Sequence, residues 1–277
     1  MKLACITLDT EPDLKSDKWD IELFRDKDKL SSFKKVIDKH KVKISGFLAT
    51  KILQCNPSLI DNAISVLPIR FELHSHNHNQ YESDSEKEVD ESMEWYLKYF
   101  GKSPKGYRAP NGLISRDGLL RLAKRGFVYD ASIFPSYRFD EYGYNNLHLP
   151  IEPYVYKTPY QDLIELPFGA VSKIRLILCL SYVKLFGLNT FKGLIQLFGL
   201  PDVVLVNSHP YDYFIKNHLH RLKGWKKWAH SRNADNALNL FDGLLTTLEQ
   251  LGYRFVFIDE VLENLDVGKM RRIDLKS

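Results

Sequence analysis

Short apolar runs that end in polar residues alternate with segments of helical periodicity along most of this chain. The runs KLACITLD and KISGFLAT, residues 2–9 and 43–50, read as buried strands, and a segment with helical spacing of apolar residues lies between them. The same unit recurs until a final helix, glycine and β-rich strand near the C-terminus. Because strands that alternate with helices form parallel sheets, the sequence predicts an α/β fold, and six or seven such units favour a barrel over an open sheet.

Length and composition are those of one globular domain. The chain has 277 residues, of which 44% are hydrophobic and 27% charged, and both values are typical of globular proteins. Single α/β barrels reach this length, so a second domain is not required. We expect one domain over residues 1–265 and a basic, frayed C-terminal tail without a role over residues 266–277.

Charge and cysteine content exclude several classes of protein. The 39 basic and 35 acidic residues give a net charge of +4 without a long basic block, so a nucleic-acid partner is not expected. Cys5, Cys55 and Cys179 are odd in number and lack metal-ligand spacing, which argues against a disulfide framework or a thiolate zinc site. The start, MKLACITLDTEPD, reaches acidic residues too early for a secretory signal. We therefore expect a cytoplasmic protein.

The most apolar part of the chain is the segment 173–200. Four basic residues interrupt it: Lys173, Arg175, Lys184 and Lys192. A membrane-spanning helix is therefore not expected, and a pair of helices packed on the core is the main interpretation. The alternative is an amphipathic surface that docks on a bilayer or binds a lipid chain. Trp225 and Trp228, three residues apart, are interpreted as a packing pair, with sugar stacking or a membrane-interface anchor as alternatives.

Five polar clusters follow predicted strands. In parallel α/β folds the reactive groups gather at the carboxyl ends of the strands, where the loops meet on one face. The clusters are Asp9 with Glu11, His74 with His78, Arg108 after Tyr107, Asp130 after Tyr129, and His209 after VVLVNS. We expect these side chains to share one site.

The run HSHNH has the spacing of a metal site. His74 and His78 are four residues apart, so one helical turn or a tight loop aims both imidazoles at a single ion while His76 points elsewhere. Two imidazoles and one carboxylate, from Asp9 or Glu11, leave coordination positions open for water and substrate, as in hydrolytic metal sites. A polar loop with surface histidines is the plainer alternative.

The other clusters carry groups suited to acid and base chemistry. Asp9 and Glu11 can divide the work between binding an ion and removing a proton from its water. Arg108 offers a guanidinium fork that orients a carboxylate, and Pro110 fixes its loop. His209 stands at a strand end and is suited to donate a proton near neutral pH. The plainer alternatives are a solvated loop, a surface arginine and a core histidine.

Taken together and in this order, the clusters resemble the polysaccharide deacetylases of the NodB-homology type, carbohydrate esterase family four. The segments TLDTEPD, LHSHNH, YRAPNG, YDASIFP and VNSHPYD are similar to the family's motifs, and the resemblance runs from Thr7 to about Asp259. It implies a distorted (β/α) barrel of about seven parallel strands. It also implies hydrolysis of an N-acetyl group on a sugar with a divalent metal, most commonly Zn²⁺, with Co²⁺ or Ni²⁺ as alternatives.

The resemblance also implies roles for particular residues. Asp9 would be the general base, Arg108 its tether and His209 the general acid, with His74 and His78 as metal ligands. Residues of the arginine-proline loop and of the fourth segment would contact the substrate, namely Pro110, Asn111 and Asp130.

Two features depart from the family pattern. Thr10 stands where the family has a second aspartate, so we reassign the metal carboxylate to Glu11, with Asp13 or Asp9 as alternatives. The pair His76 and Gln80 also has a spacing of four residues and is the alternative to His74 with His78; an amide would then replace one imidazole ligand.

We therefore predict a metal-dependent hydrolase that removes an N-acetyl group from a nucleotide- or lipid-linked sugar in surface polysaccharide biosynthesis. It would be cytoplasmic and peripheral to the inner face of the membrane, with a lipid carrier or the membrane surface contacting residues 173–200. The alternatives are a deformylase or metal-independent amidase of the same fold, and a catalytically inactive carbohydrate-binding relative.

Overall fold

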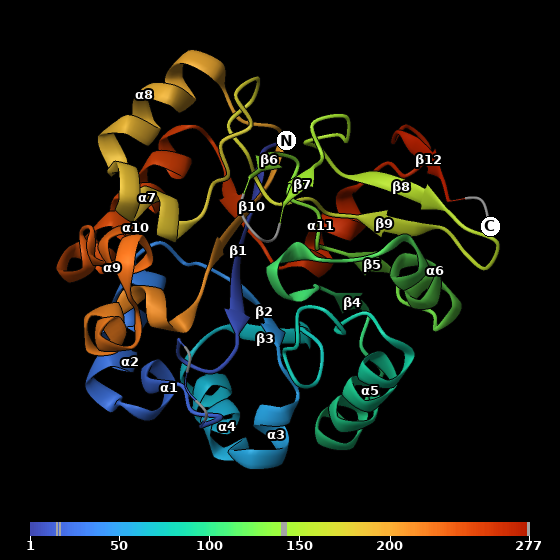
Figure 1. The fold of residues 1–277 in the computed structure, drawn as a ribbon. Coiled ribbons are helices and arrows are strands. Elements are labelled where there is room, and N and C mark those ends of the chain that lie inside the picture. The colour runs from blue at the N-terminus through green and yellow to red at the C-terminus, as the bar shows by residue number, and fades with distance from the viewer. Residues whose placement is uncertain (15, 17, 140–142, 276–277) are drawn as a thin grey trace.

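A rolled sheet of mainly parallel strands lies at the centre of the computed structural model, which describes residues 1–14, 16, 18–139 and 143–275. Helices surround the strands (Figure 1). The strands are β1 (Leu3–Thr10), β2 (Ile44–Leu48), β3 (Ile69–Leu73), β4 (Gly106–Tyr107), β5 (Tyr129–Asp130), β6 (Tyr137–Arg138), β7 (Tyr144–Asn145), β8 (Tyr154–Lys157), β9 (Leu163–Glu165), β10 (Val203–Ser208), β11 (Arg254–Phe255) and β12 (Arg272–Asp274). The helices are α1 (Glu22–Arg25), α2 (Lys27–Lys39), α3 (Lys51–Cys55), α4 (Pro57–Val66), α5 (Glu86–Phe100), α6 (Arg116–Lys124), α7 (Leu180–Phe186), α8 (Leu188–Phe198), α9 (Gly224–Ser231), α10 (Ala237–Gln250) and α11 (Ile258–Asn264).

Seven of these strands form the parallel row that the sequence predicts. Their order is β10-β1-β2-β3-β4-β5-β9, and every neighbouring pair in it is parallel. Beyond β9 the sheet continues through antiparallel β8 to β12, and β11 pairs with the start of β1. The predicted α/β barrel of about seven parallel strands is confirmed.

The barrel closes through an irregular contact between β10 and the chain after β9. The backbone N–H of Gly169 donates to the carbonyl of Leu205 at 2.8 Å. A Cβ atom at position 169 would lie 2.7 Å from that same oxygen, so only glycine allows this approach. Cys179 and Asn207 add a parallel bridge further along β10. Closure by a loop rather than by a full strand makes the barrel distorted.

Period-two alternation along β1 determines which side chains face the barrel interior. All eight residues of β1 are buried. Leu3 and Cys5 belong to the cluster inside the barrel, while Ala4, Ile6 and Leu8 belong to the cluster under the surrounding helices. Because successive side chains alternate between the two faces, the inward positions that follow are residues 7 and 9. The last inward side chain of this strand is therefore an aspartate at the mouth of the barrel.

The apolar segment 173–200 contains two helices, α7 and α8, as expected, although they start only at residue 180. Val183, Phe191 and Ile195 are buried in the main core cluster. The packing interpretation is wrong for the tryptophans, because α9 has no buried residue and the side chains of Trp225 and Trp228 are 66% and 60% exposed. Among the described residues, no helix combines the length and apolar character needed to cross a membrane.

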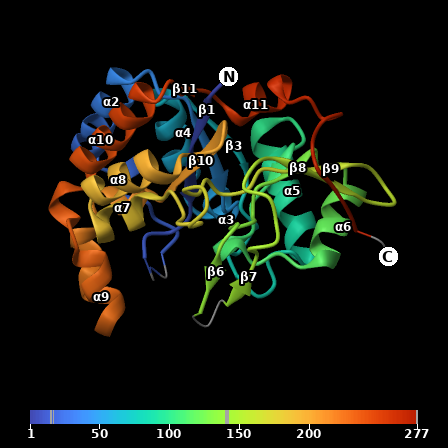
Figure 2. The ribbon, with the colours of Figure 1, turned by 90° about the horizontal axis from the view of Figure 1, so that it is seen from above.

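Helix α9 and the β6–β7 hairpin both extend on the side toward which the carboxyl ends of the central strands point (Figure 2). The opposite end of the barrel carries β11 and α11. The β-rich run after Gly252 forms only a two-residue strand, since α11 begins at Ile258.

The C-terminal segment is not the frayed tail that we expected. Strand β12 pairs in parallel with β8, and the N–H of Leu275 donates to the carbonyl of Lys157 at 2.9 Å. Ile273 and Leu275 also pack against a core cluster of the barrel. Residues 276–277 of the expected tail lie outside the described residues. Alternating apolar side chains therefore dock this basic segment on the sheet.

Candidate active site

Asp9 is held as an anion at the mouth of the barrel. Its Oδ1 accepts from Nη1 of Arg108 at 2.7 Å, and its Oδ2 accepts from Nδ2 of Asn207 at 3.0 Å. Arg108 is fully buried, with its guanidinium carbon 4.0 Å and 4.3 Å from the ring centroids of Phe47 and Phe168. Burial acts to raise the pKa of Asp9, but the charges of Arg108, His74 and His209 together outweigh it and hold the pKa below its ordinary value.

The loop after β3 turns His74 and His78 toward each other. The Nδ1 atom of His74 lies 2.8 Å from the carbonyl oxygen of Arg108. Since a carbonyl only accepts, this nitrogen carries the proton and the lone pair of Nε2 is free to bind a cation. Ser75 has a φ of 63°, and its Oγ accepts from the backbone N–H of His78 at 3.1 Å. This tight turn leaves the two imidazole centroids 5.1 Å apart.

Glu11 completes a group of three donors. Ligand atoms of Glu11, His74 and His78 all lie within 4.8 Å of one another. Nε2 of His78 is buried and in close contact with Oε2 of Glu11. Burial acts to raise the pKa of Glu11, but His78 and His74 hold it well below its ordinary value. Two imidazole nitrogens and one carboxylate are the donor set of a hydrolytic Zn²⁺ site, so these residues fit such an ion.

The alternative pair, His76 and Gln80, does not join this group. Nδ1 of His76 lies 3.0 Å from Oγ1 of Thr50, and its Nε2 lies 3.2 Å from a carboxylate oxygen of Glu91. The side-chain oxygen of Gln80 accepts from Nδ2 of Asn111 at 2.6 Å. The structure thus brings together the pair of histidines that we preferred.

Asp13, the fallback metal ligand, belongs to a different cluster. Its Oδ2 accepts from the backbone N–H of Glu22 at 2.7 Å and lies 3.5 Å from Nε2 of His218. Burial raises the pKa of Asp13 to about 7. The ligand atoms of Asp13, Glu22 and His218 lie within 4.8 Å of one another, as a group separate from that of Glu11.

His209 faces both carboxylates of the site. Its Nε2 is 4.0 Å from Oδ2 of Asp9 and 4.0 Å from Oε1 of Glu11, and its Nδ1 donates to Oδ2 of Asp212 at 3.1 Å. Asp212 is fully buried and also accepts from Nζ of Lys184 at 3.0 Å. Burial acts to lower the pKa of His209, but the hydrogen bond to Asp212 and the charge of Glu11 outweigh it and raise the pKa to about 9. His209 is therefore a proton donor at neutral pH.

A cavity of about 320 Å³ joins these groups. Its lining includes Asp9, Glu11, His74, His78, Asn111 and His209. Of the predicted substrate contacts, only Asn111 lines this cavity, and Pro110 is buried.

Asp130 does not reach the cavity. Its two carboxylate oxygens accept from the Oγ and the backbone N–H of Ser132 at 2.7 Å and 3.1 Å, and that Oγ accepts from the N–H of Ala109 at 2.8 Å. Asp130 is thus a buried support of the Arg108 loop, and its assignment as a substrate contact is corrected to this role.

Four residues of the site escaped the motif analysis. Asn207 donates a hydrogen bond to Asp9. Asp212 accepts from His209 and is itself bound by Lys184. Oε2 of Glu88 accepts from the backbone N–H of His76 at 3.1 Å. Asn207 was open to prediction, because it occupies an inward position of β10 next to the barrel mouth. For the buried ion pair of Lys184 with Asp212, the only indication in the sequence was that a lysine interrupts the apolar run of α7.

Comparisons with known proteins agree with this geometry. Residues 2–129 match the family model described as polysaccharide deacetylase, and no curated protein matches the chain. Among solved structures, one from Mycobacterium smegmatis assigned to the polysaccharide deacetylases is similar with a TM-score of 0.59 at 15% identity, over 99% of this chain and 94% of that chain.

Two further solved structures share the fold. A family 4 carbohydrate esterase from Streptomyces lividans, in complex with acetate, has a TM-score of 0.50 at 13% identity, over 99% of this chain and 97% of that chain. A pseudoenzyme of the same esterase family from Bacillus anthracis has a TM-score of 0.54 at 11% identity, over 99% of this chain and 69% of that chain. The family match and this shared barrel lead to one conclusion: residues 2–129 are similar in sequence to the polysaccharide deacetylases, and the chain as a whole has the fold of the family 4 carbohydrate esterases.

Proposed function

We propose that this protein is a metal-dependent hydrolase that removes the N-acetyl group from a nucleotide- or lipid-linked sugar in surface polysaccharide biosynthesis. One observation carries the proposal. An anionic carboxylate, three side chains that can ligate a metal and a protonated imidazole line a single cavity at the carboxyl ends of the parallel strands. The similarity of residues 2–129 to the polysaccharide deacetylases makes an amide bond the expected point of attack.

Glu11, His74 and His78 would hold the ion, for which Zn²⁺ fits the donors best and Co²⁺ or Ni²⁺ are alternatives. When bound, such an ion polarises a carbonyl oxygen and makes a water molecule more acidic. The phenol of Tyr211 donates to Oε1 of Glu11 at 3.2 Å, which fixes the carboxylate in the cavity.

The chain's own residues supply the proton transfers. Asp9 is ionised at neutral pH and stands where it can accept a proton from an attacking water, while Arg108 and Asn207 keep it in place. His209 carries a proton at neutral pH, and its Nε2 points into the same cavity. It can donate that proton to the nitrogen that leaves when the amide bond breaks.

An acetate-release assay tests this proposal. Purified protein, loaded with Zn²⁺ after chelator treatment, is incubated with short N-acetylated glycosides and with their N-formyl analogues. The proposal predicts that chelator abolishes acetate release and that Zn²⁺ restores it. It also predicts that His209→Ala lowers acetate release, whereas His148→Ala, at an exposed site, leaves it unchanged. Release of formate alone would assign a deformylase instead. Activity that survives complete metal removal would assign the metal-independent amidase.

A further inference from the structure

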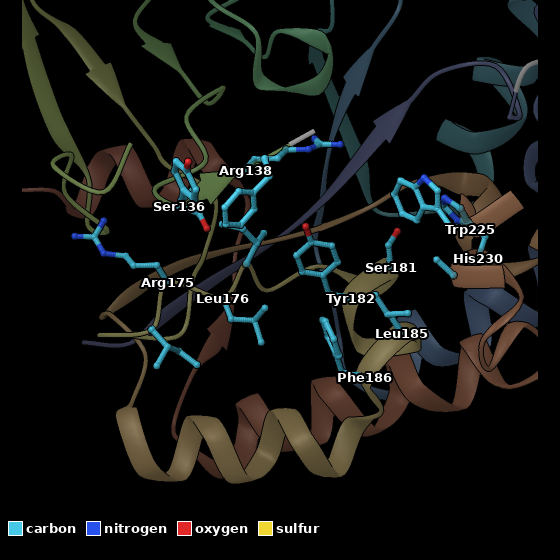
Figure 3. Close-up of a pocket in the computed structure, with 15 residues that line it drawn as sticks. Ser136, Arg138, Arg175, Leu176, Ser181, Tyr182, Leu185, Phe186, Trp225 and His230 are labelled. Carbon is cyan, nitrogen blue, oxygen red and sulfur yellow. The ribbon is translucent and has the colours of Figure 1, made fainter. Parts of the chain in front are cut away.

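Cavity space and unused ligand groups lie in different parts of this molecule. A cavity of about 550 Å³ adjoins the active-site cavity, and its labelled side chains are mainly apolar or basic (Figure 3). The described residues that line it include no carboxylate. Two carboxylates and an imidazole that the proposed reaction does not use gather elsewhere, namely those of Asp13, Glu22 and His218. We call these three side chains the second cluster.

Three segments of the chain meet at the second cluster. The backbone N–H of Asp13 donates to the carbonyl of Asp20 at 3.1 Å, and its Oδ2 accepts from the N–H of Glu22 at 2.7 Å. These bonds hold Asp13, which follows β1, beside the first residue of α1. His218 comes from the 3-10 helix η3 (Ile215–Arg221). Its Nε2 lies 2.9 Å from Oε2 of Glu22 and 3.5 Å from Oδ2 of Asp13, so one imidazole nitrogen faces two carboxylates.

The second cluster contains buried polar atoms without partners. Asp13 and His218 are only 3% and 7% exposed. Among the described residues, Oδ1 of Asp13 and Nδ1 of His218 have no hydrogen-bond partner. Buried polar atoms are costly unless a partner, an ion or an ordered water satisfies them. Ligand atoms of all three side chains lie within 4.8 Å of one another, which is close enough for them to share one cation.

Neighbouring cations only partly balance the carboxylates of the second cluster. Nζ of Lys29 forms an ion pair with Oε1 of Glu22 and also lies 3.2 Å from Oδ2 of Asp26. Nη1 of Arg221 donates to the backbone carbonyl of Asp13 at 3.4 Å. Neither contact uses Oε2 of Glu22 or the carboxylate of Asp13. The positive charges nearby do lower the affinity for a metal ion, so we expect this cluster to fill only above micromolar concentration, unlike the candidate metal centre.

We propose that Asp13, Glu22 and His218 bind a divalent cation of the Mn²⁺ type, at a site separate from the candidate metal centre. Carboxylates suit Mn²⁺, and an imidazole favours a transition metal over Mg²⁺ or Ca²⁺. The ion joins the loop that follows Glu11 to the segment that follows Tyr211, and the phenol of Tyr211 donates to Glu11. It therefore stabilises the two connections that position Glu11 and takes no part in proton transfer.

Mn²⁺ binding to the Zn²⁺-loaded protein tests the inference. Zn²⁺ is first bound at the candidate metal centre from micromolar solution, and free Zn²⁺ is removed by gel filtration. Because a given site binds Zn²⁺ more tightly than Mn²⁺, the added Mn²⁺ does not displace it. Mn²⁺ is then titrated through the micromolar and millimolar ranges, and the electron paramagnetic resonance signal of the free ion is followed. We expect about one bound Mn²⁺ per chain; no bound Mn²⁺ would overturn the inference.

Paired variants localise the ion. Glu22→Gln and His218→Gln each remove one ligand and are expected to weaken Mn²⁺ binding by more than about tenfold, a loss that even a change beside a ligand can cause. Asp20→Asn is the matched control, because it removes a carboxylate from the same loop without removing a ligand atom. Equal losses in all three variants would assign the binding to the general charge of the loop and would contradict the site.

Thermal unfolding separates a lost ligand from a folding defect, because each protein is compared with itself in the presence and absence of Mn²⁺. At about ten times the Kd, Mn²⁺ should raise the Tm of the native protein and of Asp20→Asn by about 2–4 °C. The same concentration should leave the Tm of Glu22→Gln and of His218→Gln nearly unchanged. An equal rise in Tm in the ligand variants would refute binding at the second cluster.

The His74→Ala, His78→Ala double variant distinguishes this site from the candidate metal centre. It is expected to lose its Zn²⁺ and to keep the bound Mn²⁺. Loss of Mn²⁺ binding in this variant would place the ion at the candidate metal centre and overturn the inference. Persistent Mn²⁺ binding, together with no acetate release by the Zn²⁺-loaded native protein, would support the second site and count against the deacetylase function.

Discussion

Replacing Asp212 by asparagine is expected to move the alkaline limb of the pH–rate profile to lower pH. His209 Nδ1 donates to Oδ2 of Asp212 at 3.1 Å, and the pKa of this histidine stands at about 9. The carboxylate stabilises the protonated imidazole, so removing its charge lowers the pKa of His209. A hydrogen bond between charged groups contributes about 1.5–3 kcal/mol, which corresponds to a downward shift of about 1–2 pKa units.

The assay is kcat/KM for acetate release at about pH 6 to about pH 10, with the same Zn²⁺ loading for both proteins. A cation at Glu11 also lowers the pKa of His209, but it does so in both proteins, and the difference between the two profiles remains. If His209 is the general acid, the variant loses most activity at alkaline pH and least near pH 6. An alkaline limb at the same pH in both proteins would refute this role for Asp212.

The asparagine also leaves the Lys184 ammonium buried without its carboxylate partner. The single variant is therefore expected to lose about 3–5 kcal/mol of unfolding free energy. The double variant Asp212→Asn with Lys184→Met removes that unpaired charge and should recover part of the stability while keeping the shifted pH profile. The pH profile of the double variant therefore distinguishes a lowered pKa of His209 from a loss of activity caused by unfolding.

Two further predictions concern the stability of the barrel, measured by denaturant unfolding. Gly169→Ala should lower the free energy of unfolding by about 1–3 kcal/mol, because its Cβ meets the Leu205 carbonyl. Gly193→Ala in α8 has open space around its Cβ and should raise the free energy of unfolding by about 0.5–1 kcal/mol. Equal effects of the two substitutions would argue against barrel closure at Gly169. Arg108→Gln leaves the Asp9 carboxylate buried without its cation. The substitution should lower the free energy of unfolding by about 3–5 kcal/mol and raise the pKa of Asp9. An unchanged free energy of unfolding would show that this ion pair does not stabilise the site.

The barrel and its polar mouth were predictable because strand periodicity and strand-end chemistry are local properties of the sequence. Asp9 and His209 follow apolar runs whose length sets where each strand ends. The contact of Arg108 with Asp9 was expected from the family resemblance, and the structure shows it at 2.7 Å.

Other features depend on contacts between segments far apart in the chain. Nothing near Gly169 indicates that its N–H meets Leu205, and nothing near Asp212 indicates the approach of Lys184. Asp130 lies at a strand end like the catalytic candidates, yet both of its carboxylate oxygens accept hydrogen bonds from Ser132, two residues later. Strand-end position alone therefore cannot separate a residue of the cavity from a support beneath it.

The metal content of the purified protein tests the central claim most directly. Elemental mass spectrometry is applied to the native chain, to a His74→Ala, His78→Ala double variant and to His148→Ala, after dialysis against micromolar Zn²⁺. The account predicts about one Zn²⁺ per chain in the native protein and in His148→Ala, and none at this site in the double variant. Equal metal content in all three proteins, or no bound metal in the native chain, would contradict a metal centre at Glu11, His74 and His78.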